Sequence, residues 1–123
     1  MLAHAWRSAL TDRDHARFGS LFAENAVFVD VEHRTEGLTS VRPLVGRAAI
    51  ENMCRSWLEA TPAFEYDVVD VLSTDTTGAV RWRYRVEDLD LEGVSWLTCS
   101  HGEIVDARVY FDSLGLYRGL GRV

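Results

Sequence analysis

The spacing of the apolar residues changes near the middle of this 123-residue chain. Before Pro62, apolar side chains recur every three or four positions, as they do on one face of a helix. After Pro62 they alternate with polar side chains, as on a strand with one buried face. Helices followed by a run of strands are typical of an α+β protein, in which the helices pack on one face of a sheet.

Three helices are expected in the first half. Apolar residues at helical spacing run over 2–23, and Thr11 and Asp14 interrupt them in a pattern that fits a capping box, so a second helix is expected to start near there. A third apolar stripe covers 47–60, and Pro62 ends that helix.

Strands are expected between the second and third helices and throughout the second half. Residues 26–31 form a short β-rich run, and the loop that follows over 32–46 has room for a short strand. Ser100-His101-Gly102 has the composition of a tight hairpin turn. The strands of the second half are predicted over residues 64–73, 79–88, 93–99 and 103–111.

Composition narrows the class of protein. The length and the 47% apolar content indicate one folded domain over 1–123. The net charge of −6 makes nucleic acid an unfavourable partner, because its phosphates would be repelled. The sequence has no run of about 18 apolar residues and no leader-like N-terminus, so we expect no membrane span and no secretory signal. Two cysteines fit reduced thiols in a cytoplasmic protein.

Five short motifs follow one another in the order of the expected elements. They are Arg13-Asp14, Leu21-Phe22-Ala23-Glu24-Asn25-Ala26-Val27-Phe28, Gly46-Arg47-Ala48-Ala49-Ile50, His101-Gly102-Glu103-Ile104 and Asp112-Ser113-Leu114-Gly115-Leu116-Tyr117-Arg118-Gly119-Leu120-Gly121. The motifs and the order of the elements resemble the nuclear transport factor 2-like fold and, within it, the SnoaL-like family. The likeness covers nearly the whole chain and implies a cone-shaped, curved antiparallel sheet packed against about three N-terminal helices.

Asp30 is the first candidate catalytic residue, because it interrupts the apolar run Val27–Val31. A carboxyl group that faces an apolar pocket has a raised pKa, which suits proton abstraction next to a carbonyl. The alternative is a strand-end aspartate that points to solvent. The position resembles that of the catalytic base in ketosteroid isomerases, but Trp6 and Ser95 stand where those enzymes have a tyrosine and a second acid.

Asp112 and His33 are the other two candidates. Asp112 resembles the acid/base aspartate of SnoaL-like cyclases, which implies that it removes a proton from a carbon next to a carbonyl before an aldol ring closure. The alternative for Asp112 is a helix N-cap. His33 follows Asp30 on the expected loop and is either a general base or a solvated side chain.

Arg85 and Glu87 offer an alternative chemistry. They resemble the arginine–acid pair of limonene-type epoxide hydrolases, which would act together with Asp112. That role requires the arginine side of the strand over 79–88 to turn inward. Alternation instead predicts that the apolar side, with Trp82, lines the interior.

Aromatic side chains are abundant, and a pocket lined by them suits a flat, largely apolar, oxygenated ligand. The alternative is that they fill the core. The candidate binding residues are Trp6, Trp57, Tyr66, Trp82, Tyr84, Trp96 and Tyr110. The sequence has no glycine-rich phosphate loop and no metal-ligand spacing, so we expect no nucleotide cofactor and no metal.

These observations and the resemblance predict a cofactor-independent acid/base enzyme for a hydrophobic small molecule, of the polyketide-cyclase or isomerase type. One alternative is an epoxide hydrolase or dehydratase on the same fold. Another is a non-catalytic module for small-molecule binding or dimerisation. The family and the row of arginines at 81, 83 and 85 further suggest a homodimer formed through the outer face of the sheet.

Overall fold

The computed structural model describes residues 2–34, 37–40 and 43–111. Within these ranges the chain forms three helices and seven strands. The helices are α1 (Leu2–Thr11), α2 (His15–Ser20) and α3 (Arg47–Ala60). The strands are β1 (Phe22–Arg34), β2 (Gly37–Ser40), β3 (Leu44–Val45), β4 (Glu65–Ser73), β5 (Thr77–Val86), β6 (Leu89–Ser100) and β7 (Glu103–Phe111).

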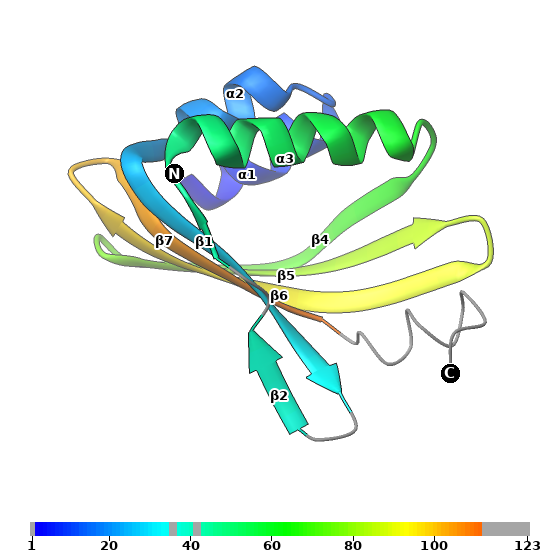
Figure 1. Cartoon of the computed structure of the whole chain (residues 1–123). Coiled ribbons are helices and arrows are strands. Elements are labelled where there is room, and N and C mark those ends of the chain that lie inside the picture. Colours follow the sequence, from blue (N-terminus) through cyan, green and yellow to red (C-terminus); the bar gives the residue numbers. More distant parts are fainter. Residues whose placement is uncertain (1, 35–36, 41–42, 112–123) are drawn as a thin grey trace.

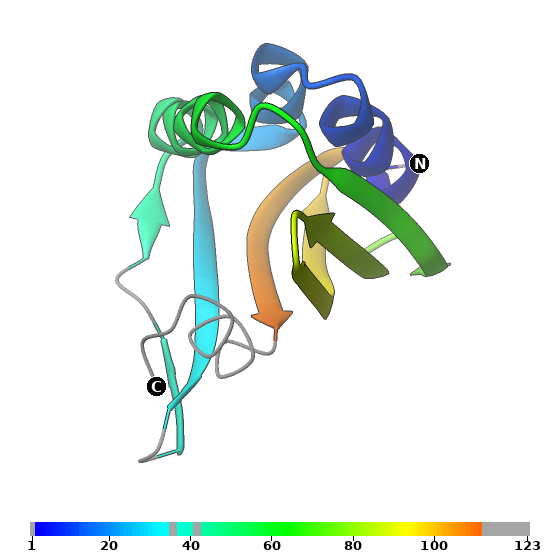
Figure 2. The ribbon, with the colours of Figure 1, turned by 90° about the vertical axis from the view of Figure 1, so that its right-hand side faces the viewer.

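The strands form one curved sheet in the order β2-β1-β7-β6-β5-β4, and β3 pairs with β1 along the same edge as β2. Neighbouring strands are antiparallel except for β1 and β7, which run parallel. All three helices lie over the concave face of this sheet (Figures 1 and 2). The predicted α+β architecture, a curved sheet packed against three early helices, is therefore confirmed.

The boundary between α1 and α2 lies where the sequence predicts it, but its cap differs from the expected capping box. The carboxylate of Asp14 accepts a hydrogen bond from the backbone N–H of Arg17 at 3.0 Å, so Asp14 is itself the N-cap of α2. Thr11 instead ends α1. Asp12 and Arg13 allow the chain to turn between Thr11 and the Asp14 cap, whereas a Thr11 cap would require helix from residue 12 onward.

Arg13 connects this turn to the end of α3. Its backbone has φ of +56°, and its guanidinium group donates to the carbonyl oxygens of Leu58 and Thr61, the second at 3.0 Å. The guanidinium carbon also lies 4.9 Å from the centre of the Phe64 ring. One side chain therefore satisfies carbonyls at the C-terminal end of α3 and fixes that helix against the α1–α2 turn.

β1 is longer than the predicted strand over 26–31. It runs from Phe22 to Arg34, because β7 pairs along one edge while β2 and β3 pair along the other. The last hairpin follows the prediction closely. Ser100 pairs with Glu103, and His101 and Gly102 both have positive φ, which is the geometry of a type I′ turn.

The side chains of β5 alternate between a buried apolar side and an outward arginine side, as predicted. Val80, Trp82 and Tyr84 are at most 8% exposed and belong to the core beneath the helices. The intervening arginines point away from the helices: Arg83 forms an ion pair with Asp90, and Arg85 forms ion pairs with two carboxylates of β4. The described helices are too short or too polar to cross a membrane.

Candidate functional site

A row of side chains crosses the concave face from β1 to β6. Asp30 of β1 pairs with Val109 of β7, which in turn pairs with Ser95 of β6. Phe28 and Val109 belong to the buried core, so alternation places the side chain of Asp30 on the same, helix-covered face. Asp30 is partly buried and Ser95 fully buried. Two strand spacings separate their backbones by roughly 10 Å.

Trp82 lies over the strand that carries Ser95. Its indole Nε1 donates to the hydroxyl oxygen of Ser95 at 3.0 Å. The ring approaches Gly93 so closely that a Cβ at that position would stand 2.3 Å from Cζ2 of the ring. Trp82 therefore has a fixed orientation on the concave face, set by one hydrogen bond and by the missing side chain of Gly93.

Trp6 and Tyr66 form a second polar contact among aromatic rings. The indole Nε1 of Trp6 donates to the hydroxyl of Tyr66 at 3.0 Å. Burial raises the pKa of Tyr66, although the donated hydrogen bond opposes that shift, so the hydroxyl stays protonated at neutral pH. In the described part of the chain this hydroxyl makes no other hydrogen bond, which leaves its proton available to an acceptor.

Tyr66 also lines a hollow of about 320 Å³ at the N-terminal end of β4. Arg13, Arg85 and Phe64 contribute to its wall. The other lining residues are Thr11, Glu65 and Asp67. Both arginines are already hydrogen-bonded, Arg13 to backbone carbonyls and Arg85 to Asp67, so this hollow is a structural junction between α1 and β4.

Five of the seven predicted binding residues lie on the helix side of the sheet and pack largely against one another. Tyr84 contacts Trp57 with 5.7 Å between ring centres, and the rings of Tyr66 and Trp82 stack at 5.9 Å. Trp6 packs edge-on against Phe18 at 4.8 Å. Within the described residues these rings form an aromatic layer on the concave face, and ligand binding to them stays a prediction.

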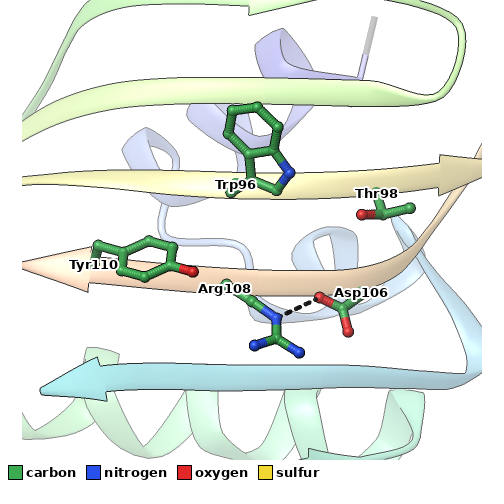
Figure 3. A pocket seen from close by; sticks show the side chains of 5 residues that line it. All are labelled: Trp96, Thr98, Asp106, Arg108 and Tyr110. Carbon is green, nitrogen blue, oxygen red and sulfur yellow. Dashed lines mark hydrogen bonds and ion pairs between the residues drawn. The ribbon is translucent and has the colours of Figure 1, made fainter. Parts of the chain in front are cut away.

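Trp96 and Tyr110, the other two predicted binding residues, lie on the opposite face of the sheet. They are 48% and 41% exposed. Together with three polar side chains they line a hollow of about 660 Å³ (Figure 3). The polar side chains are Thr98, Asp106 and Arg108. The sheet thus separates these two aromatic residues from the five on the concave face.

The remaining candidates are placed only in part. His33 lies in β1, where its backbone pairs with Leu38 of β2. Asp112 lies outside the described residues. Glu87 occupies the exposed turn after β5, and Arg85 points to the outer face, where it pairs with Asp67 at 2.8 Å. The arginine–acid pair therefore does not turn toward the concave face.

Two residues of this region were not predicted as part of the site. Ser95 was predicted only to lack the carboxyl group of the second acid, although a serine between apolar strand neighbours is a signal for a buried hydrogen bond. Gly93 carries a second signal, because glycine inside a strand often marks the close approach of another group. Among residues 2–34, 37–40 and 43–111 no three His, Cys, Asp or Glu side chains gather as metal ligands would.

Comparisons with known proteins agree on the architecture. The model of the SnoaL-like domain matches residues 3–107. No curated protein matches the sequence significantly. Many solved structures match, and those compared in detail are 15–21% identical, which shows a shared fold.

Three of these structures illustrate the range of the fold. A Kribbella flavida protein, provisionally assigned as a ketosteroid isomerase, is 21% identical with a TM-score of 0.70, covering 89% of this chain and 74% of that one. A Catenulispora acidiphila protein with a ketosteroid isomerase-like fold, solved in complex with trimethylamine, is 16% identical with a TM-score of 0.75. The match covers 98% of this chain and 92% of that one. A provisionally assigned polyketide cyclase from Sinorhizobium meliloti is 15% identical with a TM-score of 0.68. The match covers 88% of this chain and 92% of that one.

Proposed function

The chain belongs to the SnoaL-like family, and from this premise we propose that it is a cofactor-independent acid/base enzyme for a hydrophobic, oxygenated small molecule, of the polyketide-cyclase or isomerase type. The observation that carries the proposal is the position of Asp30. This carboxyl group stands on the concave face next to Phe28 and Val109, in one row with the hydroxyl of Ser95. The names of related structures, an isomerase and a polyketide cyclase, support the same class of chemistry.

Asp30 is the proposed general base. It would accept a proton from a carbon next to a ligand carbonyl, a step for which a positioned carboxylate contributes about 10²–10⁴-fold in rate. Trp82, held by Ser95, would form a wall against which a flat ligand stacks. Asp112 follows the end of β7 in the sequence and is the proposed partner acid, which would return a proton to oxygen or carbon.

Epoxide hydrolysis is not part of the proposal. That chemistry would need Arg85 beside the reacting oxygen, whereas Arg85 lies on the outer face in ion pairs with Glu65 and Asp67. His33, whose backbone lies in β1, stays an untested candidate from the sequence.

The proposal is tested by proton exchange, which needs no knowledge of the natural product. Two- and three-ring ketones with acidic α-hydrogens are incubated with the protein in D₂O, and NMR follows deuterium entry. We expect catalysed exchange with at least one ketone, and a loss of about 100-fold or more in Asp30→Asn. Asp75→Asn, an exposed carboxyl in the β4–β5 turn, is the matched control and should keep the full rate.

Asp112→Asn is measured beside Asp30→Asn to separate the two roles. If Asp30 is the base, Asp30→Asn abolishes deuterium exchange into the ketone. Asp112→Asn, which removes the partner acid, should slow conversion of the ketone to product more than it slows deuterium exchange. Full exchange in both variants would overturn the acid/base mechanism. Ketone binding without exchange in the wild type would favour the non-catalytic binding module.

A further inference from the structure

The strand at the end of the sheet away from β1 has an open edge. β4 pairs with β5 along one side, and in the described part of the chain no strand pairs along its other side (Figure 2). Backbone N–H and C=O groups that face an open edge can pair with a strand of another chain. Natural sheets therefore carry features that prevent such pairing at their edges.

The sequence of β4 makes this edge a good template for another strand. Four of the five residues from Val68 to Leu72 are valine or leucine, and the fifth is Asp70. Val69 is 53% exposed and Leu72 is 71% exposed, so part of this apolar segment lies in water. Short segments with high β-propensity and little charge pair readily into intermolecular sheets.

The hairpin turn after β4 fixes the direction in which each backbone N–H of the strand points. The N–H of Thr74 donates to the carbonyl oxygen of Thr77 at 2.7 Å, so these two residues form a hydrogen-bonded pair. Hydrogen-bonded and non-hydrogen-bonded pairs alternate along an antiparallel ladder. Val71 lies three positions before Thr74, opposite Val80, and so belongs to a non-hydrogen-bonded pair. The N–H of Val71 therefore points to the open edge.

Asp70 occupies that N–H. Its carboxylate Oδ1 accepts a hydrogen bond from the N–H of Val71 at 2.9 Å. Asp70 also stands at a β-bulge, because the register between β4 and β5 shifts between Val68 and Asp70. A bulge bends and twists its strand, which makes the edge harder to pair. One residue thus brings a charge, a capped N–H and an irregular ladder to the middle of the apolar segment.

We propose that Asp70 protects the open edge of β4 from pairing with the same edge of a second copy of the chain. An antiparallel pairing centred on Val68–Leu72 would use the Val71 N–H of each copy as a donor. It would also bring the two Asp70 carboxylates together near the centre, where like charges oppose the pairing. Both effects depend on the Asp70 side chain. The protection concerns the edge of one strand and is independent of contacts through the faces of the sheet.

Substitutions of Asp70 separate the charge from the capped N–H. Asp70→Ala removes both, and the folded variant should assemble at least about tenfold faster than the wild type, because two N–H groups are freed and two charges are lost in each pair. Asp70→Asn loses the charge but keeps an oxygen that accepts from Val71, so a smaller acceleration is expected. Asp70→Lys keeps a charge at the edge and should stay close to the wild type. Light scattering and sedimentation velocity follow particles larger than those of the wild type.

Hydrogen exchange of the Val71 amide locates the contact. Before assembly this amide should exchange faster in Asp70→Ala than in the wild type, and in the assembled variant it should become protected. Asp75→Ala, at an exposed position of the β4–β5 turn, is the matched control and should change neither assembly nor this exchange. Circular dichroism and urea denaturation verify that each variant is folded. Asp70→Asn, which has nearly the same shape as the wild type, carries the test if Asp70→Ala fails to fold.

Three results would overturn the proposal. The first is a folded Asp70→Ala, or in its place a folded Asp70→Asn, that assembles no faster than the wild type. The second is assembly of Asp70→Ala that leaves the Val71 amide in fast exchange, because the contact would then lie elsewhere. The third is equal assembly of Asp70→Ala and the control Asp75→Ala. Assembly of Asp70→Lys as fast as that of Asp70→Ala would overturn the part assigned to the charge.

Discussion

Trp82 occupies the space that a side chain at position 93 would need. A Cβ on Gly93 would lie 2.3 Å from Cζ2 of the ring and 2.5 Å from the carbonyl oxygen of Tyr110, both far inside van der Waals contact. The hydrogen bond from Trp82 to Ser95 depends on this close approach, because the indole reaches the Ser95 hydroxyl only when it lies directly against β6. The aromatic wall of the concave face is thus set by the one residue type that lacks a side chain.

Gly93→Ala is therefore expected to destabilise the protein by about 1–3 kcal/mol through overpacking. It should also shift the tryptophan emission, since the indole must leave its contact with Ser95. Urea denaturation followed by fluorescence measures both effects. Gly78→Ala is the matched control, because a Cβ there meets Leu97 at an ordinary 3.6 Å. Equal stability of the two variants would show that the Trp82 ring is free to move aside.

Arg13→Ala should destabilise the protein by about 1–3 kcal/mol, because the carbonyl oxygens of Leu58 and Thr61 lose their donor. Arg13→Lys keeps the charge but lacks the two-pronged guanidinium group, so an intermediate loss is expected. Thermal unfolding of both variants measures the effect. Arg55→Ala, an exposed change on α3, should stay within about 0.5 kcal/mol of the wild type. A similar loss in Arg55→Ala would contradict a specific role for Arg13.

Tyr66→Phe removes the acceptor of the Trp6 indole and leaves a buried N–H without a partner. The expected cost is about 1–3 kcal/mol of unfolding free energy. Tyr84→Phe is the matched control, since the Tyr84 hydroxyl makes no hydrogen bond with the described residues. Denaturant titration of the two variants side by side gives the difference, which should vanish if the Trp6–Tyr66 contact contributes nothing.

Stability should fall at alkaline pH. Burial, aided by the nearby carboxylates of Glu51 and Asp14, raises the pKa of the Cys54 thiol from 9.0 to about 11. Between these values the unfolded chain has lost the proton and the folded chain still holds it, so the free energy of unfolding decreases as pH rises. Two pKa units correspond to about 2.7 kcal/mol at most.

Melting temperatures recorded from pH 8 to 11 check this expectation. Cys54→Ala removes the group, so its melting temperature should fall less steeply above pH 9 than that of the wild type. Tyr66 adds a decline of the same sign above pH 10, because burial raises its pKa as well. Parallel curves for wild type and Cys54→Ala would show that Cys54 does not contribute.

The sequence was most informative where one pattern held over a whole element. The stripe of α3 and the alternation of Val80, Trp82 and Tyr84 predicted both the elements and their buried faces, because each pattern has a single period over ten or more residues. β1 was predicted too short. Its ends depend on pairing with β7 and β2, which are distant or weakly patterned in the sequence.

The two faces of β6 show where such reasoning fails. Leu97 on one face and Trp96 on the other are both large and apolar, so alternation alone does not tell which side is buried. For this reason the sequence predicted that Trp96 lines the ligand pocket, although its side chain lies on the outer face of the sheet. Asp30 is a contrasting case, because one carboxylate within an apolar run is conspicuous in the sequence; its backbone pairs with that of Val109, and its catalytic role stays a prediction.

The parallel pairing of β1 with β7 also has a consequence in time. β1 ends at Arg34, and its parallel partner β7 is complete only at Phe111. During synthesis on the ribosome β1 therefore lacks this partner until the residues between the two strands have been added. At 5–20 residues per second that interval lasts roughly 4–15 s. Until then β1 exposes an unpaired edge with an apolar side, which makes the nascent chain, rather than the finished one, the form most exposed to aggregation.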